Sequence, residues 1–436
     1  MNKTLLAAAM AGALLAMPAV ANPVKPRPPA PAGEFGPVLA QLVSELKALP
    51  DEPNFTRQLD NYAKFGFSPE LRPRLKRLFG TERPFPLERV SGSAKGQVDY
   101  VGKMAAHSYK QANGTEFSWT EAVANITTDK AGSAVTSTGS WPSLLVTAPG
   151  SSFSVVNMGF SGKQRRGADG VAYGDAVVKI GVVTARAMRA EGDSKEIVRL
   201  DGITLRSDVT RRGAMAEMAS RTTVDAIVFG NEKIERTNVA FRLTNLPAKA
   251  LADLDKGMRA QQNSHLSQEA QTKALTGLMT DFGKRAMAAG ATLVIDDISA
   301  SYRGNTASIK GSIGFQKLVE ADFSNVALWA KKMVARFEVR VPVALVKDLA
   351  RVFAAKDGDA AAPDAEQLIG KVVSDGYAVL DKQVLRSTIE IRDSKLIVNG
   401  KEIDAAAHMK TFSRKVLPPA AQPPIAPERQ PEPAAE

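Results

Sequence analysis

A period-two alternation of apolar and polar residues over positions 88–246 constrains the fold of this 436-residue chain most strongly. Such alternation is typical of strands that bury one face and expose the other. The clearest apolar positions are Val156, Met158 and Phe160, then Ile203 and Leu205, then Val239, Phe241 and Leu243. Pairs typical of turns, such as Gly230-Asn231 and Asp201-Gly202, lie between the runs and predict antiparallel strands joined by tight turns. Little helical pattern separates the runs, which argues against a doubly wound parallel sheet.

Helical periodicity precedes this region. Apolar residues at three-to-four spacing over 38–49 predict a helix that Pro50 ends. A second short helix is predicted over 71–79, with Ser68-Pro69-Glu70 as its start. Pro73 lies unusually far inside that helix, which favours a later start.

Two units in the second half of the chain share one order of features. Positions 241–247 and 337–342 alternate like strands and end at Pro247 and Pro342, about 95 residues apart. A proline with its fixed φ and missing N–H suits the first turn of a following helix. Further helices are predicted near 265–289 and 364–376, and hairpins over 292–315 and 386–403. The match is short enough to arise by chance, so both duplication and coincidence remain open.

These patterns predict an α+β fold, namely a large, twisted, mostly antiparallel β-sheet with helices packed on one side. The predicted regions are an N-terminal helical segment over 35–87, the antiparallel region over 88–246 and a helix-plus-hairpin repeat region over 247–412. A sheet of this size must hide or pair its edges. One way is to curl into a half-barrel with an apolar inner face.

Both ends of the chain have the composition of processing or linker segments. Lys3, the uncharged run over 5–17 and the small-x-small site Ala19-Val20-Ala21 predict a signal peptide over 1–21, cut near Ala21. A Pro-rich linker follows over 22–34, and a Pro/Ala-rich tail covers 413–436. We therefore expect an exported, periplasmic protein without a transmembrane span after cleavage. The chain has no cysteine, so neither a disulfide nor a thiol-linked lipid anchor is available.

Residues that carry chemistry are scarce. His107, His265 and His408 lie far apart, without the neighbouring His or carboxylate of a metal site. Asp296 and Asp297 are adjacent, and on a regular strand they would point to opposite faces. No nucleophile elbow, phosphate-binding loop or dinucleotide fingerprint occurs. We expect no catalytic residue, no cofactor and no bound metal.

One segment is distinctive because it combines cations with an apolar stripe. Between positions 71 and 83, leucines recur at helical spacing, and most of the positions between them are cationic. Candidate contacts with an anionic membrane surface are Arg72, Arg74, Lys76 and Arg77. The alternative is that the leucines pack on the sheet and the cations are merely solvated. The formal net charge of +11 is compatible with either. Nucleic acid is not expected in the envelope, so the expected partners are a lipid or an envelope protein, and a homo-oligomer is a further option.

The C-terminal part of the chain carries a family resemblance. Its most distinctive parts are Asp375-Gly376-Tyr377 and the stretch over 387–401, which ends Leu396-Ile397-Val398-Asn399-Gly400-Lys401. Together with the alternating strands and the Val341-Pro342 helix start, these residues resemble the bacterial YdgA-like family of exported envelope proteins of unknown function. The family supplies no catalytic residues to carry over. Its members often retain an N-terminal membrane anchor, whereas the segment here has the features of a cleavable one.

The sequence thus favours a non-enzymatic periplasmic protein that holds an apolar ligand or lipid, or that supports maintenance of the cell envelope. An envelope scaffold that forms homo-oligomers is the alternative. A hydrolase with an unrecognised site is the third hypothesis.

Overall fold

The computed structural model describes residues 34–50, 52–91, 94–188, 194–262, 267–325, 328, 331–357 and 364–403. The predicted signal peptide and C-terminal tail, most of the predicted linker, and His265 and His408 therefore lie outside the described residues.

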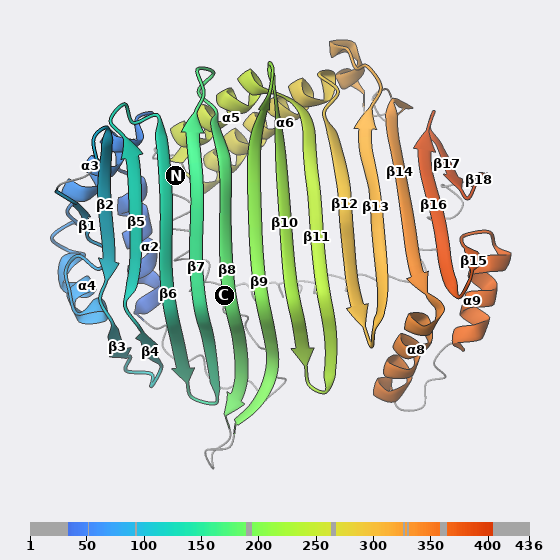
Figure 1. The fold of residues 1–436 in the computed structure, drawn as a ribbon, viewed down its shortest axis with the longest axis horizontal. Coiled ribbons are helices and arrows are strands. Elements are labelled where there is room, and N and C mark those ends of the chain that lie inside the picture. The colour runs from blue at the N-terminus through green and yellow to red at the C-terminus, as the bar shows by residue number, and fades with distance from the viewer. Residues whose placement is uncertain are drawn as a thin grey trace, which may run out of the picture.

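One large antiparallel sheet dominates these residues (Figure 1). Its eighteen described strands are β1 Leu87–Arg89, β2 Gln97–Met104, β3 His107–Lys110, β4 Glu116–Trp119, β5 Ala122–Asp129, β6 Ala134–Ala148, β7 Ser151–Arg166, β8 Ala172–Met188, β9 Ser194–Arg212, β10 Met215–Phe229, β11 Glu232–Pro247, β12 Thr292–Tyr302, β13 Asn305–Phe315, β14 Met333–Pro342, β15 Val379–Asp381, β16 Val384–Arg392, β17 Lys395–Val398 and β18 Lys401–Ile403. From β5 to β14 each strand pairs with the next along the chain. The sheet is not closed into a barrel.

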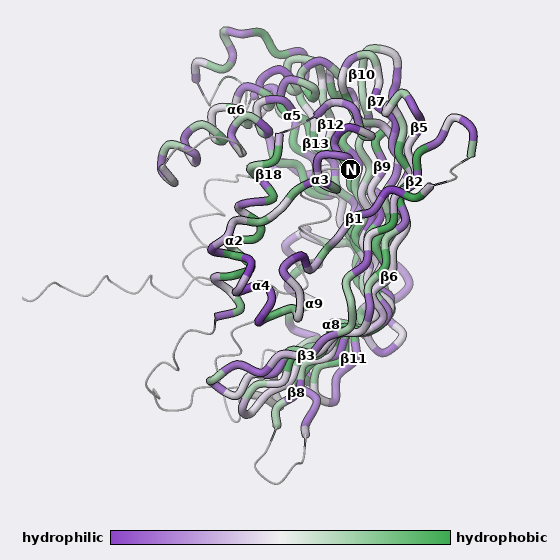
Figure 2. The backbone as a smooth tube through the Cα atoms, turned by 90° about the vertical axis from the view of Figure 1, so that its left-hand side faces the viewer, coloured by the Kyte–Doolittle hydropathy of each residue, from purple (hydrophilic) through white to green (hydrophobic). Residues whose placement is uncertain are grey.

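Helices lie on one side of this sheet, on its concave face (Figure 2). The described α-helices are α2 Phe35–Lys47, α3 Phe55–Lys64, α4 Arg72–Phe79, α5 Ala248–Gln262, α6 Gln268–Ala288, α8 Val343–Asp357 and α9 Ala365–Ser374, and a 3₁₀ helix, η1, covers Glu320–Ser324. The predicted α+β class, with a large antiparallel sheet and helices on one side, is confirmed. Helix α3 was not predicted separately, and α4 starts at Arg72, later than Ser68-Pro69-Glu70, with Pro73 in its first turn.

The repeated order of elements in the second half is also present. Strand β11 ends at Pro247 and leads into α5, α6, β12 and β13. Strand β14 ends at Pro342 and leads into α8, α9, the additional short strand β15, and then β16 and β17. Because β11 and β14 are three antiparallel pairings apart, they run in opposite directions. The two helix pairs therefore lie at opposite ends of the strands (Figure 1).

A crease crosses six neighbouring strands of the sheet. The crease contains one residue from each strand, and each lies opposite the next on the neighbouring strand. This follows from the residue pairs on both sides of the line. They are Pro142, Asn157, Gly181, Gly202, Asp225 and Arg236. Three of them have positive φ, namely Asn157 at 58°, Gly202 at 61° and Arg236 at 49°. Such a residue interrupts the regular pleat. The residues that face the helices are therefore even-numbered on one side of it and odd-numbered on the other, as with Met158 and Val155 on the two sides of Asn157. At the end of the sheet that holds the β6–β7 and β10–β11 turns, the strands curve toward the helix side (Figure 2).

The crease corrects one prediction from the sequence. Gly230-Asn231 is a turn between β10 and β11, as expected. Asp201-Gly202 is not a turn, because it lies within the continuous strand β9. A single left-handed glycine bends a paired strand, whereas a tight reversal needs two central residues with suitable dihedral angles.

Candidate functional site

The cationic helix α4 is docked on the sheet by its leucines. Leu71, Leu75 and Leu78 are completely buried and belong to the large core cluster beneath α2 and α4. That cluster also contains Phe117 and Trp119 from β4. The leucine stripe is thus used for packing within the protein, as the alternative interpretation of this segment expected.

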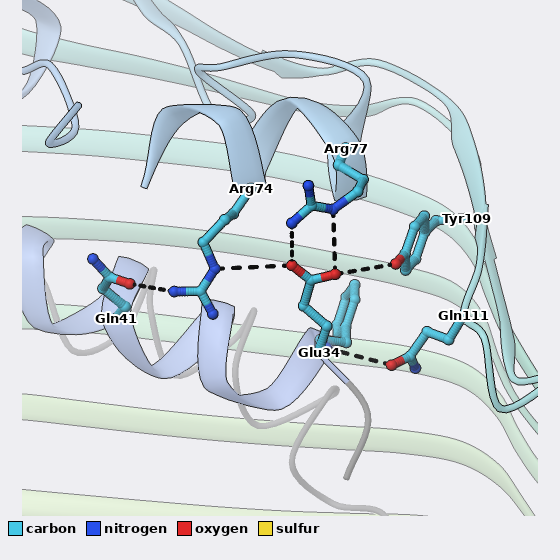
Figure 3. Close-up of polar contacts among 7 residues, drawn as sticks. Glu34, Gln41, Arg74, Arg77, Tyr109 and Gln111 are labelled. Carbon is cyan, nitrogen blue, oxygen red and sulfur yellow. Dashed lines mark hydrogen bonds and ion pairs between the residues drawn. The ribbon is translucent and has the colours of Figure 1, made fainter. Parts of the chain in front are cut away.

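Three of the four predicted membrane-contact residues have partners within the protein. Arg72 donates from Nε to the carbonyl of Phe67 at 2.7 Å, and Arg74 donates from Nη1 to Gln41 Oε1 at 2.8 Å. Arg77 is bonded to Glu34 (Figure 3). Lys76 is exposed and has no hydrogen bond or ion pair with any described residue. Contact of these four side chains with an anionic membrane stays a prediction.

Glu34 organises this cluster, and sequence reasoning missed it. Its carboxylate accepts two hydrogen bonds from Arg77, lies 3.9 Å from Arg74 Nε and accepts from the Tyr109 hydroxyl at 3.5 Å (Figure 3). The hydrogen bond from Arg77 lowers the pKa of Glu34, because it stabilises the charged carboxylate. Glu34 thus ties the start of α2 to α4 and β3. From the sequence it belongs to the predicted Pro-rich linker over 22–34, since no periodic pattern includes it.

His107 lies in an aromatic contact within the fold. Its imidazole packs 5.6 Å from the Trp119 ring and lies beside the Cα of Gly80, which ends α4 with φ of 73°. In the part of the chain that the structure describes, no hydrogen bond joins this ring to a serine or an aspartate.

The adjacent carboxylates depart from the sequence prediction. Arg242 donates to Asp296 at 2.7 and 2.8 Å, and Asn238 donates to Asp297 at 2.6 Å. Asn238 and Arg242 are four residues apart on β11 and share one face, so both carboxylates lie on that face. The prediction of opposite faces is wrong because a β-bulge between Ala240 and Phe241 inserts an extra residue at this point of β12. Arg242 lowers the pKa of Asp296, first through its hydrogen bond.

The helix-side face of the central sheet is an uncharged apolar wall. Directly opposite residues of antiparallel strands project to the same face, so the register defines rows across the sheet. One row contains Phe160, Val178, Leu205, Thr222, Val239, Ile298, Ile309 and Val339. The next row toward α6 contains Gly162, Ala176, Ser207, Ser220, Phe241, Ile295, Gly311 and Phe337. Neither row contains a charged residue. The opposite face carries Asp175, Arg206, Arg221, Arg242, Lys310 and Arg336, among others.

Helices cover this wall only around its margins. The α2–α4 cluster packs on Met158 and Ile180, α6 packs near Met218 and Leu243, and the α8–α9 cluster packs on Val341. Between these margins four large apolar side chains stay exposed, at 43% for Leu205, 39% for Phe241 and 37% each for Ile298 and Ile309. We call these four residues the open patch. Phe241, Ile298 and Ile309 lie on adjacent strands, and β10 with Ser220 and Thr222 separates Leu205 from them. Sheet faces that helices cover are normally apolar, whereas a group of large apolar side chains left exposed on one face is typical of an interaction or ligand surface.

The open patch has the dimensions of an acyl chain. It extends from β9 to β13, which is four strand spacings of about 4.8 Å, or about 19 Å. One leaflet of a bilayer core is about 15 Å thick, which is the length available to one extended lipid chain. No group of three or more His, Asp or Glu that could hold a metal occurs among the described residues. No described helix combines the length and hydropathy required to cross a membrane.

The fold and its surface define a class of protein with one open antiparallel sheet. One face of this sheet is apolar and concave, and the helices lie on that face (Figure 2). The chain belongs to DUF945, a family of bacterial proteins of unknown function, whose family model matches residues 63–406. Membership is consistent with the YdgA-like resemblance of the C-terminal part. Neither the curated proteins nor the solved structures contain a match.

Proposed function

We propose that this protein is a non-enzymatic, exported protein of the cell envelope that holds the acyl chain of a lipid on the open patch. The observation that carries the proposal is the exposure of Leu205, Phe241, Ile298 and Ile309 on a wall without charge. An acyl chain covering these side chains would remove apolar surface from water, at about 25 cal/mol per Å². The predicted signal peptide supports placing this function in the periplasm, where lipids must cross an aqueous space.

Co-purification tests the proposal. The protein is purified from the envelope fraction, and bound lipids are extracted and analysed by mass spectrometry. We expect an acyl lipid at a fixed ratio to the wild-type protein and its loss from Ile298→Asp. The charge of this variant lies where the chain would lie, and burying an unpaired carboxylate is strongly unfavourable.

Val334→Asp is the matched control. Val334 is exposed to 40%, close to the 37% of Ile298. It lies on the face of β14 that points away from the helices, because it is three residues from the helix-side Phe337. It should retain the lipid. Wild-type protein without any acyl lipid, or equal lipid in both variants, would contradict the proposal.

A scaffold that forms homo-oligomers is the second candidate, and one edge of the sheet favours it. Strand β15 pairs with β16 and has no other strand partner in the described ranges. Its Val379 and Leu380 are exposed to 55% and 46%, and exposed apolar edge strands tend to pair with other chains. Light scattering of the wild type and of Val379→Lys tests this candidate. If the wild type associates through β15, the variant should stay monomeric at concentrations where the wild type associates. A wild type that is monomeric at all concentrations would exclude it.

A further inference from the structure

Three hydroxyl side chains interrupt the apolar wall where Leu205 and Phe241 of the open patch flank β10. Ser207 on β9 and Ser220 on β10 are directly opposite, and Thr222 is two residues beyond Ser220 on the same face. Ser207 is exposed, and Ser220 and Thr222 are half-buried. None of the three hydroxyls is hydrogen-bonded to another described residue. They therefore offer free donors and acceptors within an otherwise apolar surface.

The three hydroxyls lie between Leu205 and the other residues of the open patch, because Thr222 is opposite Leu205 and Ser220 is opposite Phe241. Leu205 borders the hydroxyls on β9 and β10, whereas Phe241, Ile298 and Ile309 continue the surface across β11, β12 and β13. A ligand that matches this order has a hydrogen-bonding group at one end and a chain of roughly 15 Å at the other.

The absence of charge in these rows restricts the polar group. A free carboxylate or phosphate seated on an uncharged wall would lose hydration without an opposite charge in either row to replace it. A neutral ester or hydroxyl group loses less, and the three protein hydroxyls can replace its water partners.

Resting on the proposed function above, we infer that the open patch binds a neutral acyl ester of the monoacylglycerol type. The ester and glycerol hydroxyls lie on Ser207, Ser220 and Thr222, and the chain runs across β11 toward Ile309.

Competition binding tests it. Delipidated full-length protein is loaded with a fluorescent acyl probe, which is then displaced by a monoacylglycerol or by the fatty acid of the same chain length at pH 8. We expect the monoacylglycerol to bind about tenfold more tightly, the equivalent of one or two hydrogen bonds. In Ser220→Ala/Thr222→Val this preference should fall to about twofold or less, while fatty-acid binding is unchanged.

Thr223→Val is the matched control, because Thr223 is adjacent in sequence and projects to the opposite face of β10. It should keep the wild-type preference. A wild type that prefers the fatty acid, or a Ser220→Ala/Thr222→Val variant that keeps the preference, would overturn the inference and leave chain binding intact. If neither ligand displaces the probe and the probe itself does not bind, the proposed function fails as well.

Discussion

Replacing Gly202 by Ala tests whether the crease is built from specific close contacts. Gly202 has φ of 61°, and the side chain of Asp225 on β10 lies where a Cβ would be. That Cβ would stand 1.9 Å from Asp225 Oδ2, 2.4 Å from its Cγ and 2.9 Å from its Cβ. The carboxylate can rotate away, but the Asp225 Cβ moves only with the backbone of its strand.

Gly213→Ala is the matched control because it has the same backbone strain without the contact. Gly213 has φ of 66°, and no atom lies within 4 Å of its would-be Cβ. A left-handed alanine costs about 1–2 kcal/mol, which both variants share. The added overpacking at Gly202 should cost a further 1–3 kcal/mol or so. Gly202→Ala is thus expected to lose about 2–5 kcal/mol of unfolding free energy, and Gly213→Ala about 1–2 kcal/mol.

Urea unfolding followed by far-ultraviolet circular dichroism measures both losses. Asp225→Ala, combined with Gly202→Ala, removes the carboxylate but keeps the Cβ at 2.9 Å, so it should recover only part of the difference. If Gly202→Ala is no less stable than Gly213→Ala, the account of the crease is refuted.

Three further predictions follow from the α2–α4 region. Glu34→Gln should lower the unfolding free energy at pH 7 by about 0.5–1 kcal/mol, as for a partly exposed ion pair. Since the pKa of Glu34 is lowered in the folded state, its stabilisation is present above the ordinary value of 4.5 and is lost as the pH falls through the folded value. A wild-type advantage in urea titrations that is undiminished at about pH 3 would contradict this sign. Leu75→Ala, at a completely buried position, should cost about 2–5 kcal/mol by the same titration, and a cost below about 1 kcal/mol would argue against the docked α4. Lys76→Gln removes no internal bond, so it should weaken sedimentation with anionic vesicles at low salt if α4 touches membranes, by about 1 kcal/mol. Equal sedimentation of this variant and the wild type would remove the membrane contact at that residue.

The periodic patterns predicted the fold well because the alternation of apolar and polar residues depends only on which face of each strand is buried. The strand ends at Pro247 and Pro342 were predictable for a similar reason, since a proline ends a ladder and starts a helix by its own geometry. Asp201-Gly202 was misassigned because a glycine with positive φ occurs both in turns and in bent strands. The two are distinguished by the position of Gly202 inside β9, where the flanking pairs place it opposite Asp225 on β10.

The site was less predictable because it depends on contacts between distant segments. A single bulge brought Asp296 and Asp297 to one face, and no local pattern marks a bulge within an apolar run. The sequence indicated an apolar face but not which of its residues the helices leave exposed. Leu205 and Met218 have equivalent alternating patterns, yet α6 packs near Met218 and leaves Leu205 open. The partnership of Glu34 with Arg77 joins positions 43 residues apart, beyond the reach of spacing arguments.

Titration of delipidated protein with a fluorescent acyl probe tests the central claim most directly. The claim is that the open patch on the concave face binds an acyl chain. It predicts saturable binding to the wild type and to Val334→Asp, and loss of binding in Ile298→Asp and Leu205→Asp at unchanged circular dichroism. Absence of saturable binding to the wild type, or equal binding by all four proteins, would contradict it.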